Sequence, residues 1–499
     1  MSRPDLSTVP GVATVGTPEE RSLEAVYHDT PDLRLARARV TLRRRTGGPD
    51  EGWHVKLPVG DGARRELHSP LGRATKTPPK GVSAPVRGLV RTAPLGPVAT
   101  LHTRRQVTDL CDEAGRVLAE VADDAVTATA HGAAPGEPAT VLSWREVEVE
   151  LVDGDEALLD AVGRRLVEAG AAPSSSGSKL ARVLAERLGP PDGVPAGGAK
   201  RGTRRKRAGP TAGAVVLEAL AAQVRALQEA DVLVRTDQPG GIHDLRVACR
   251  RLRSILAAFR PVLDREQTDP LRDELQWVGQ EVSGARDGEV ALGHLRALVQ
   301  RQPAELVLGP VAARLQQTAI QDAEAGRRAA ARAMEDKRYL RLVDALFELL
   351  ETPPLTAVAE QPARAVLVDA VRRSGRRFRR QLAATQDEPH GPALHEARKA
   401  AKRLRYTAEV AVPVLGGRAR KLVKAAKKVQ ETLGDRQDTV VTRELCRTLG
   451  LAAFGAGESA WTYGRLHALE EARAERAEAD FRDRREPALT RALAKATAS

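Results

Sequence analysis

The chain has 499 residues, of which 29 % are charged and 42 % hydrophobic, and its formal net charge is +13. This length is too great for one ordinary core, and the composition excludes a disordered or fibrous protein, so we expect several globular domains. Only 3 % of the residues are aromatic. This scarcity disfavours nucleic acid as a partner, because readers of single strands need aromatic side chains for base stacking. The positive charge favours another anion.

Three widely spaced cysteines, Cys111, Cys249 and Cys446, form no CxxC pair. We therefore expect neither a disulfide framework nor a zinc site, and free thiols favour the cytoplasm. The N-terminal residues lack the apolar region of a signal peptide. No uncharged apolar stretch approaches the roughly 20 residues that a membrane span needs. We expect a cytoplasmic protein that does not cross a membrane.

Short alternating runs of apolar and polar residues, such as GWHVKLP and WREVEVEL, fill the first part of the chain. They predict an antiparallel sheet, followed by helices near residues 153–170 and 178–188. Residues 189–213 are rich in Gly, Pro, Ala and basic residues and predict a linker. From residue 214 onward, long Ala/Leu/Arg/Glu stretches with 3.6-residue spacing predict a helical bundle.

Charged residues alternate along several of the expected strands. WREVEVEL places three glutamates on one face, Arg43 and Arg45 share a face, and His54 shares one with Lys56. If the sheet closes with these faces inward, its cations would hold a polyanion and its carboxylates would hold Mg²⁺ or Mn²⁺. The alternative is a sandwich whose polar face meets water, and alternation alone favours that alternative.

Residues 5–188 resemble a CYTH domain of the triphosphate tunnel metalloenzyme superfamily. In chain order, the matching strings are YHDTPDLRLARARVTLRRRTGGPDEGWHVKLP, RRE, TRR, AEVADD, WREVEVEL and SKLARVL. The resemblance implies an antiparallel β tunnel barrel that binds a triphosphate compound together with Mg²⁺ or Mn²⁺. The implied triphosphate-binding residues are Arg43, Arg45, Lys56, Arg65, Arg105 and Lys179. The implied metal ligands are Glu148, Glu150, Glu146, Glu120 and Asp124.

One departure concerns the family's N-terminal strand, whose ExExK motif carries two carboxylates and a lysine at alternate positions. This sequence contains no such string, and the adjacent Glu19 and Glu20 do not replace it because they face opposite ways. Either the domain has lost half of its metal ligands, or the start codon is placed too late. We expect a barrel with an unpaired edge and a poor catalyst, which leaves its status as an enzyme open.

An internal repeat marks the helical half, which also carries a net charge of +9. HDLRVACRRLR at residues 243–253 matches HEARKAAKRLR at residues 395–405. At about 100° per residue, positions 1, 4, 8 and 11 of each segment form one stripe. Repetition of so many like charges favours an anionic ligand over a solvated face, and metal binding by the histidines is a weaker alternative. The stripes are His243, Arg246, Arg250 and Arg253, and His395, Arg398, Lys402 and Arg405.

Residues 214 to about 490 resemble a CHAD domain, through these stripes and through LQWVGQEVSGARD, KRYLRLVDAL and KKVQETLGDRQD. The resemblance implies two pseudo-symmetric four-helix bundles and a basic groove that binds inorganic polyphosphate. Lys424, Lys427 and Lys428 are the further contacts that it implies.

We therefore expect a two-domain α+β protein with a tunnel domain at residues 1–188, a linker at 189–213 and a helical domain at 214–499. The favoured function is polyphosphate binding, with a first domain that binds or hydrolyses triphosphate or polyphosphate, and location at polyphosphate granules would follow. One alternative is a soluble triphosphatase for thiamine or nucleoside triphosphate, with the helical half as a localiser. Another is a nucleic-acid binder. The sequence leaves the oligomeric state open.

Overall fold

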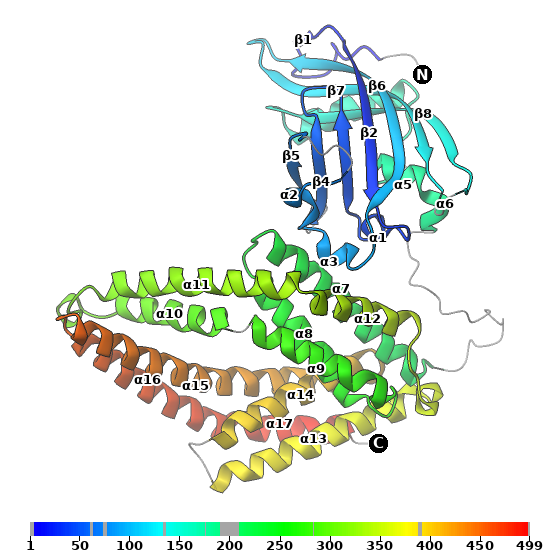
Figure 1. The fold of residues 1–499 in the computed structure, drawn as a ribbon. Coiled ribbons are helices and arrows are strands. Elements are labelled where there is room, and N and C mark those ends of the chain that lie inside the picture. Colours follow the sequence, from blue (N-terminus) through cyan, green and yellow to red (C-terminus); the bar gives the residue numbers. More distant parts are fainter. Residues whose placement is uncertain are drawn as a thin grey trace. The chain divides into compact units, whose positions relative to one another are not determined.

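A computed structural model describes residues 4–59, 63–72, 77–132, 136–174, 176–189, 209–282, 284–387 and 392–497. The chain divides into two compact units, Met1–Ala196 and Gly197–Ser499, and each is described by itself (Figure 1). Most of the expected linker lies outside the described residues. A sheet-based unit followed by a helical unit confirms the predicted two-domain α+β class.

The first unit is built on one antiparallel sheet of eight strands, in the order β5-β4-β3-β2-β6-β7-β8, with β1 paired to β6. The strands are β1 Thr14–Val15, β2 Glu19–Asp29, β3 Thr41–Thr46, β4 Gly52–Val59, β5 Ala63–Ser69, β6 Gly96–Cys111, β7 Val117–Ala130 and β8 Thr140–Leu151. Among the described residues no strand joins β5 to β8. The sheet is therefore open, with the unpaired edges that we expected, and is not a closed barrel.

Apolar residues on both faces of the sheet are covered by short helices. The helices are α1 Arg34–Arg37, α2 Lys80–Ser83, α3 Arg87–Val90, α4 Glu156–Glu168, α5 Lys179–Val183 and α6 Ala185–Leu188. On one face, α4 and the N-terminal segment pack on β6, β7 and β8 through Leu110, Val121 and Leu158. On the other, Leu180 and Leu184 pack on one end of the sheet. This second face is here called the inner face, and its remaining part carries most of the charged side chains described below.

The second unit consists of long helices. They are α7 Ala212–Arg235, α8 Gly241–Ala258, α9 Arg265–Glu281, α10 Gly284–Gln300, α11 Val311–Glu335, α12 Lys337–Glu351, α13 Ala363–Asp387, α14 Pro392–Leu415, α15 Gly417–Gly455, α16 Trp461–Asp480 and α17 Glu486–Thr497. None of the described helices has the length and hydropathy that crossing a bilayer requires.

The sequence repeat corresponds to a repeat of packing. Helices α7, α8, α9 and α12 pack together, as do α13, α14, α15 and α17, and α8 packs against α14. The two halves meet where α7 and α13 begin: Ala212 N donates to Gln361 O at 2.9 Å, and Ala363 N donates to Pro210 O at 3.0 Å. These reciprocal bonds hold the repeats in register. Helices α10, α11 and α16 pack with the far part of α15 around a separate core.

Gly241 allows α8 to begin directly against α7. A Cβ at this position would lie 2.8 Å from Val234 N and 2.9 Å from Leu233 C, both backbone atoms. We expect G241A to destabilise the protein by about 1–3 kcal/mol through this overlap. As the matched control, G279A places a methyl group in open space on α9 and should stabilise it by about 0.5–1 kcal/mol. Thermal unfolding of both variants measures the difference, and equal shifts would contradict this packing.

Candidate functional sites

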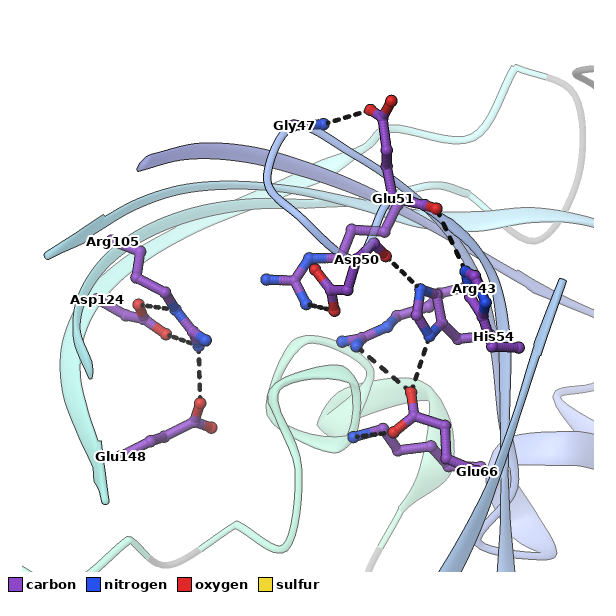
Figure 2. Close-up of polar contacts among 12 residues, drawn as sticks. Arg43, Gly47, Asp50, Glu51, His54, Glu66, Arg105, Asp124 and Glu148 are labelled. Carbon is purple, nitrogen blue, oxygen red and sulfur yellow. Dashed lines mark hydrogen bonds and ion pairs between the residues drawn. The ribbon is translucent and has the colours of Figure 1, made fainter. Parts of the chain in front are cut away.

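The inner face of the sheet carries two groups of charged side chains. One group lies on the arm formed by β6, β7 and β8, and the other lies on the arm formed by β3, β4 and β5. Residues paired directly across a ladder share a face. Arg105 is paired with Asp124, and Asp124 with Glu146. On the other arm, Arg43 is paired with His54. Figure 2 shows the two groups pointing toward one another across the concave side of the sheet.

The acidic residues of β7 and β8 surround one ammonium group. Lys179 Nζ lies 3.1 Å from Asp124 Oδ2, 2.5 Å from Glu146 Oε1 and 2.7 Å from Glu148 Oε1. Arg105 donates to both oxygens of Asp124, at 2.8 and 2.7 Å, and to Glu148 Oε2 at 2.8 Å. Two residues predicted to bind phosphate are therefore ion-paired with three residues predicted to bind metal.

Local structure fixes Lys179 in this position. Ser178 accepts a hydrogen bond from Ala181 N and so caps α5, which begins at Lys179. Burial opposes ionisation of Asp124, yet Arg105 and Lys179 hold the pKa of its carboxyl below the usual value. Burial likewise opposes the charge on Lys179, yet the neighbouring carboxylates raise its pKa. Ion pairing thus favours the charged forms of Asp124 and Lys179 in spite of their burial.

The opposite arm, on β3, β4 and β5, is basic, and its side chains converge on Glu66, which was not among the residues predicted from the sequence. His54 Nδ1 lies 2.9 Å from Glu66 Oε1, Lys56 Nζ lies 3.2 Å from Oε2, and Arg43 Nη2 lies 3.8 Å from Oε1. The hydrogen bond with His54 is the largest cause that lowers the pKa of Glu66 to about 2, burial opposes it, and Lys56 adds to it. The register of β4 against β5 pairs Lys56 with Glu66, and this pairing places Glu66 among the basic residues. The sequence alone does not give that register.

The two arms influence each other electrostatically. Arg45 is bonded to Asp50 at 2.5 Å. Burial and then Arg43 lower the pKa of Arg45, and Arg105 on the other arm lowers it further. Arg65 lies elsewhere, because the β4–β5 register pairs it with Leu57 on the opposite face. Of the six residues expected to bind triphosphate, five therefore share the inner face.

The expected metal ligands are divided between two places on this face. Glu120 and Glu150 are cross-strand partners, further along the ladder from the cluster around Lys179. Carboxylate oxygens are the ligands that Mg²⁺ and Mn²⁺ prefer. However, the three carboxylates that come together enclose Lys179. Within the described residues, no group of three His, Cys, Asp or Glu side chains is arranged to hold a metal ion. The donors suit a hard cation, but their present arrangement does not.

In the helical unit, one buried tyrosine joins the two basic stripes. Tyr406 is 2 % exposed, and its hydroxyl accepts a hydrogen bond from Arg250 Nε at 3.1 Å. The guanidinium groups of Arg405 and Arg251 lie 4.7 and 5.5 Å from its ring centre. Glu409 lies 3.6 Å from Arg405 and 3.5 Å from Arg251. The sequence repeat does not predict this contact, because Ser254 stands in the first copy where the second copy has Tyr406.

Lys402 is half-buried among the cations of both stripes. Burial is the main cause that lowers its pKa to about 7, followed by the charges of Arg398, Arg250 and Arg405, while Asp438 opposes the shift. Arg398 packs over Gly434 of α15, with its Nη2 atom 3.1 Å from the position that a Cβ would take. Three like charges around one ammonium make this a region of strong positive potential.

The other predicted residues of the helical unit are placed as follows. His395 Nδ1 lies 3.0 Å from Gln437 Oε1, and burial and Lys399 lower the pKa of the ring, so it is neutral at pH 7. Arg253 donates to Gln276 at 2.5 Å. His243 and Arg246 lie half-buried on α8, and Lys424, Lys427 and Lys428 lie exposed on α15, the last two paired with Glu431.

A second group of cations adjoins the first stripe at Arg253, and its other members were not predicted. Burial lowers the pKa of Arg403 to about 10, and the charges of Arg377, Arg272, Arg260 and Arg253 add to the effect. Arg377 is on α13, Arg272 on α9 and Arg403 on α14, whereas Arg253 is on α8 and Arg260 follows the end of α8. The sequence could not reveal this group, because its members lie far apart along the chain and meet only in the fold.

Comparison with known proteins identifies both units. The CYTH domain family matches residues 6–184, and the CHAD domain family matches residues 218–447. The chain is a CYTH–CHAD tandem protein. An uncharacterized protein of Mycobacterium tuberculosis (strain H37Rv) is 37 % identical to this CYTH–CHAD chain over 487 residues, which cover 95 % of this chain and 91 % of that protein. Both resemblances found in the sequence are thus confirmed.

Two solved structures resemble this CYTH–CHAD chain in part. PptA from Streptomyces chartreusis matches with a TM-score of 0.45 at 21 % identity, over 57 % of this chain and 99 % of that chain. The CHAD domain from the plant Ricinus communis matches with a TM-score of 0.44 at 25 % identity, over 57 % of this chain and 92 % of that chain.

The low pKa of Glu66 makes the stability of the CYTH unit depend on pH. Its folded-state pKa of about 2 lies below the ordinary value of 4.5, so the carboxylate stabilises the fold above pH 4.5, and this contribution is lost as the pH falls toward 2. We expect E66Q to unfold at a lower temperature than the wild type at pH 7, with a difference that shrinks below pH 4.5. A difference that stays constant across this range would contradict the ion-pair assignment.

Proposed function

We propose that this CYTH–CHAD protein binds inorganic polyphosphate on the surface where α8 and α14 pack together. The observation that carries the proposal is Lys402, half-buried and crowded by Arg250, Arg398 and Arg405. Such crowding is unfavourable in the unliganded protein and is relieved by an anion that approaches all four cations. Two repeats supply these residues, so the positive surface extends along both helices.

The chemistry of the surface suits a chain of phosphates. Arginine guanidinium groups bind phosphate oxygens through paired donors, and lysine adds a point charge. Tyr406 is engaged by Arg250, Arg251 and Arg405 and is buried, so it offers no platform for a base. These features favour polyphosphate over nucleic acid as the ligand.

For the CYTH unit, we infer binding of a triphosphate group between the two arms of the inner face. Arg43, Arg45 and Lys56 would hold the phosphates from the basic arm, with Arg105 and Lys179 opposite. Asp124, Glu146 and Glu148, with Glu120 and Glu150 beyond them, would hold Mg²⁺ or Mn²⁺, which neutralises phosphate charge and activates water when bound. This arrangement also supports the alternative function, a small-molecule triphosphatase with the CHAD unit as localiser. A cytoplasmic protein at polyphosphate granules fits the first function best.

Removal of charge at the centre of the α8/α14 surface tests polyphosphate binding. We expect R250Q/K402Q in the full chain to weaken binding of long-chain polyphosphate about tenfold or more at moderate salt. The slope of log affinity against log salt should fall by about one to two, because fewer counterions are released. The control R491Q/K495Q removes the same net charge from exposed positions on α17 and should bind as the wild type does. Equal affinity of both variants would disprove this site.

Binding to the CHAD unit should also depend on pH through Lys402. Its pKa of about 7 in the free protein rises when a polyanion stabilises the ammonium, so binding takes up a proton above pH 7. Affinity should therefore fall as the pH rises from about 7 to about 9, and K402R should reduce this dependence because arginine stays charged. Calorimetry in two buffers of different ionisation enthalpy measures the proton uptake. An unchanged pH profile in K402R would contradict this role for Lys402.

A further inference from the structure

The cluster on β7 and β8 already contains a cation that belongs to the chain. Lys179 Nζ contacts one oxygen each of Asp124, Glu146 and Glu148, at 2.5 to 3.1 Å. Side chains on two strands thus converge on a single positive centre, as carboxylates do around a bound metal ion. The lysine and a divalent ion therefore require the same oxygen atoms.

Charge balance within the cluster strengthens this competition. Three carboxylates face Lys179 and Arg105, and Arg182 lies 4.0 Å from Glu146, so cations of the chain already compensate much of their negative charge. A divalent ion that enters must displace the ammonium or share its oxygens against direct repulsion. Lys179 lies at the first residue of α5, so its side chain can swing away without unwinding the middle of a helix.

The geometry points to Lys179 as an internal competitor of the metal ion: its ammonium holds the three carboxylates until a phosphate group draws it away. Divalent metal and triphosphate would then bind the CYTH unit cooperatively, because the anion offers Lys179 a new partner as the ion takes the old ones. The identification of that anion as a triphosphate rests on the proposed function. The competition between Lys179 and a divalent ion for the three carboxylates does not depend on it.

Titration of the full chain with Mn²⁺ alone, followed by electron paramagnetic resonance, tests the competition. We expect weak Mn²⁺ binding by the wild type and binding about tenfold tighter or more by K179M, which keeps the length of the side chain and removes the charge. Adding E148Q to K179M should abolish the gain, which locates the ion. The control R182M removes a half-exposed charge that lies 4.0 Å from Glu146 and should give a much smaller gain.

Wild-type protein provides a second measurement that does not depend on the folding of any variant. At Mn²⁺ concentrations that saturate the site, release of Lys179 should increase hydrogen exchange in α5, whose start the lysine holds to β7 and β8. Equal Mn²⁺ affinity in K179M and wild type, or saturation of the wild type without faster exchange in α5, would overturn the inference. Because no phosphate compound is present, these outcomes are independent of whether the protein binds triphosphate.

Discussion

Like charges held close together, against their mutual repulsion, are the constraint on which the candidate site of the CHAD unit depends. Lys402 lies among Arg250, Arg398 and Arg405, and burial together with these like charges lowers its pKa. The cores of both helical bundles offset this repulsion. Leu245, Leu252 and Leu404, on the same two helices, are fully buried in one continuous core. The apolar sides of α8 and α14 therefore fix where their basic sides meet.

Tyr406 and Glu409 make this crowding tolerable at the contact between the repeats. The guanidinium groups of Arg251 and Arg405 lie over the ring of Tyr406. The hydroxyl of this tyrosine accepts a hydrogen bond from Arg250. Glu409 compensates part of the charge of Arg251 and Arg405. Neither residue has a counterpart in the first repeat, where Ser254 and Ala257 occupy the equivalent positions. The duplicated unit has thus become asymmetric at the place where its two copies touch.

The CYTH unit handles its charges in the opposite way. Its inner face carries cations and carboxylates together, and the structure pairs them: Lys179 and Arg105 with Asp124, Glu146 and Glu148, and three basic side chains with Glu66. An anion that enters this face must exchange existing ion pairs for new ones. On the CHAD surface the central cations repel one another, and this difference supports the two proposals, a long polyanion for the CHAD unit and a short phosphate ligand for the CYTH unit.

The sequence by itself determined the two-unit architecture, the membership of both units in their families, and the residues of the basic stripes. Strand alternation, helical periodicity and the repeat of His and basic residues are local patterns. They can be recognised in the sequence without knowing how the strands and helices pack together. Only the tertiary structure decided which charges meet. The β4–β5 register places Arg65 on the outer face and Glu66 on the inner face. Helix packing brings together the arginines around Arg403. The position of α5 places Lys179 among the carboxylates of β7 and β8. These are contacts between residues far apart in the chain, and they follow from strand pairing and core packing, which no single segment specifies.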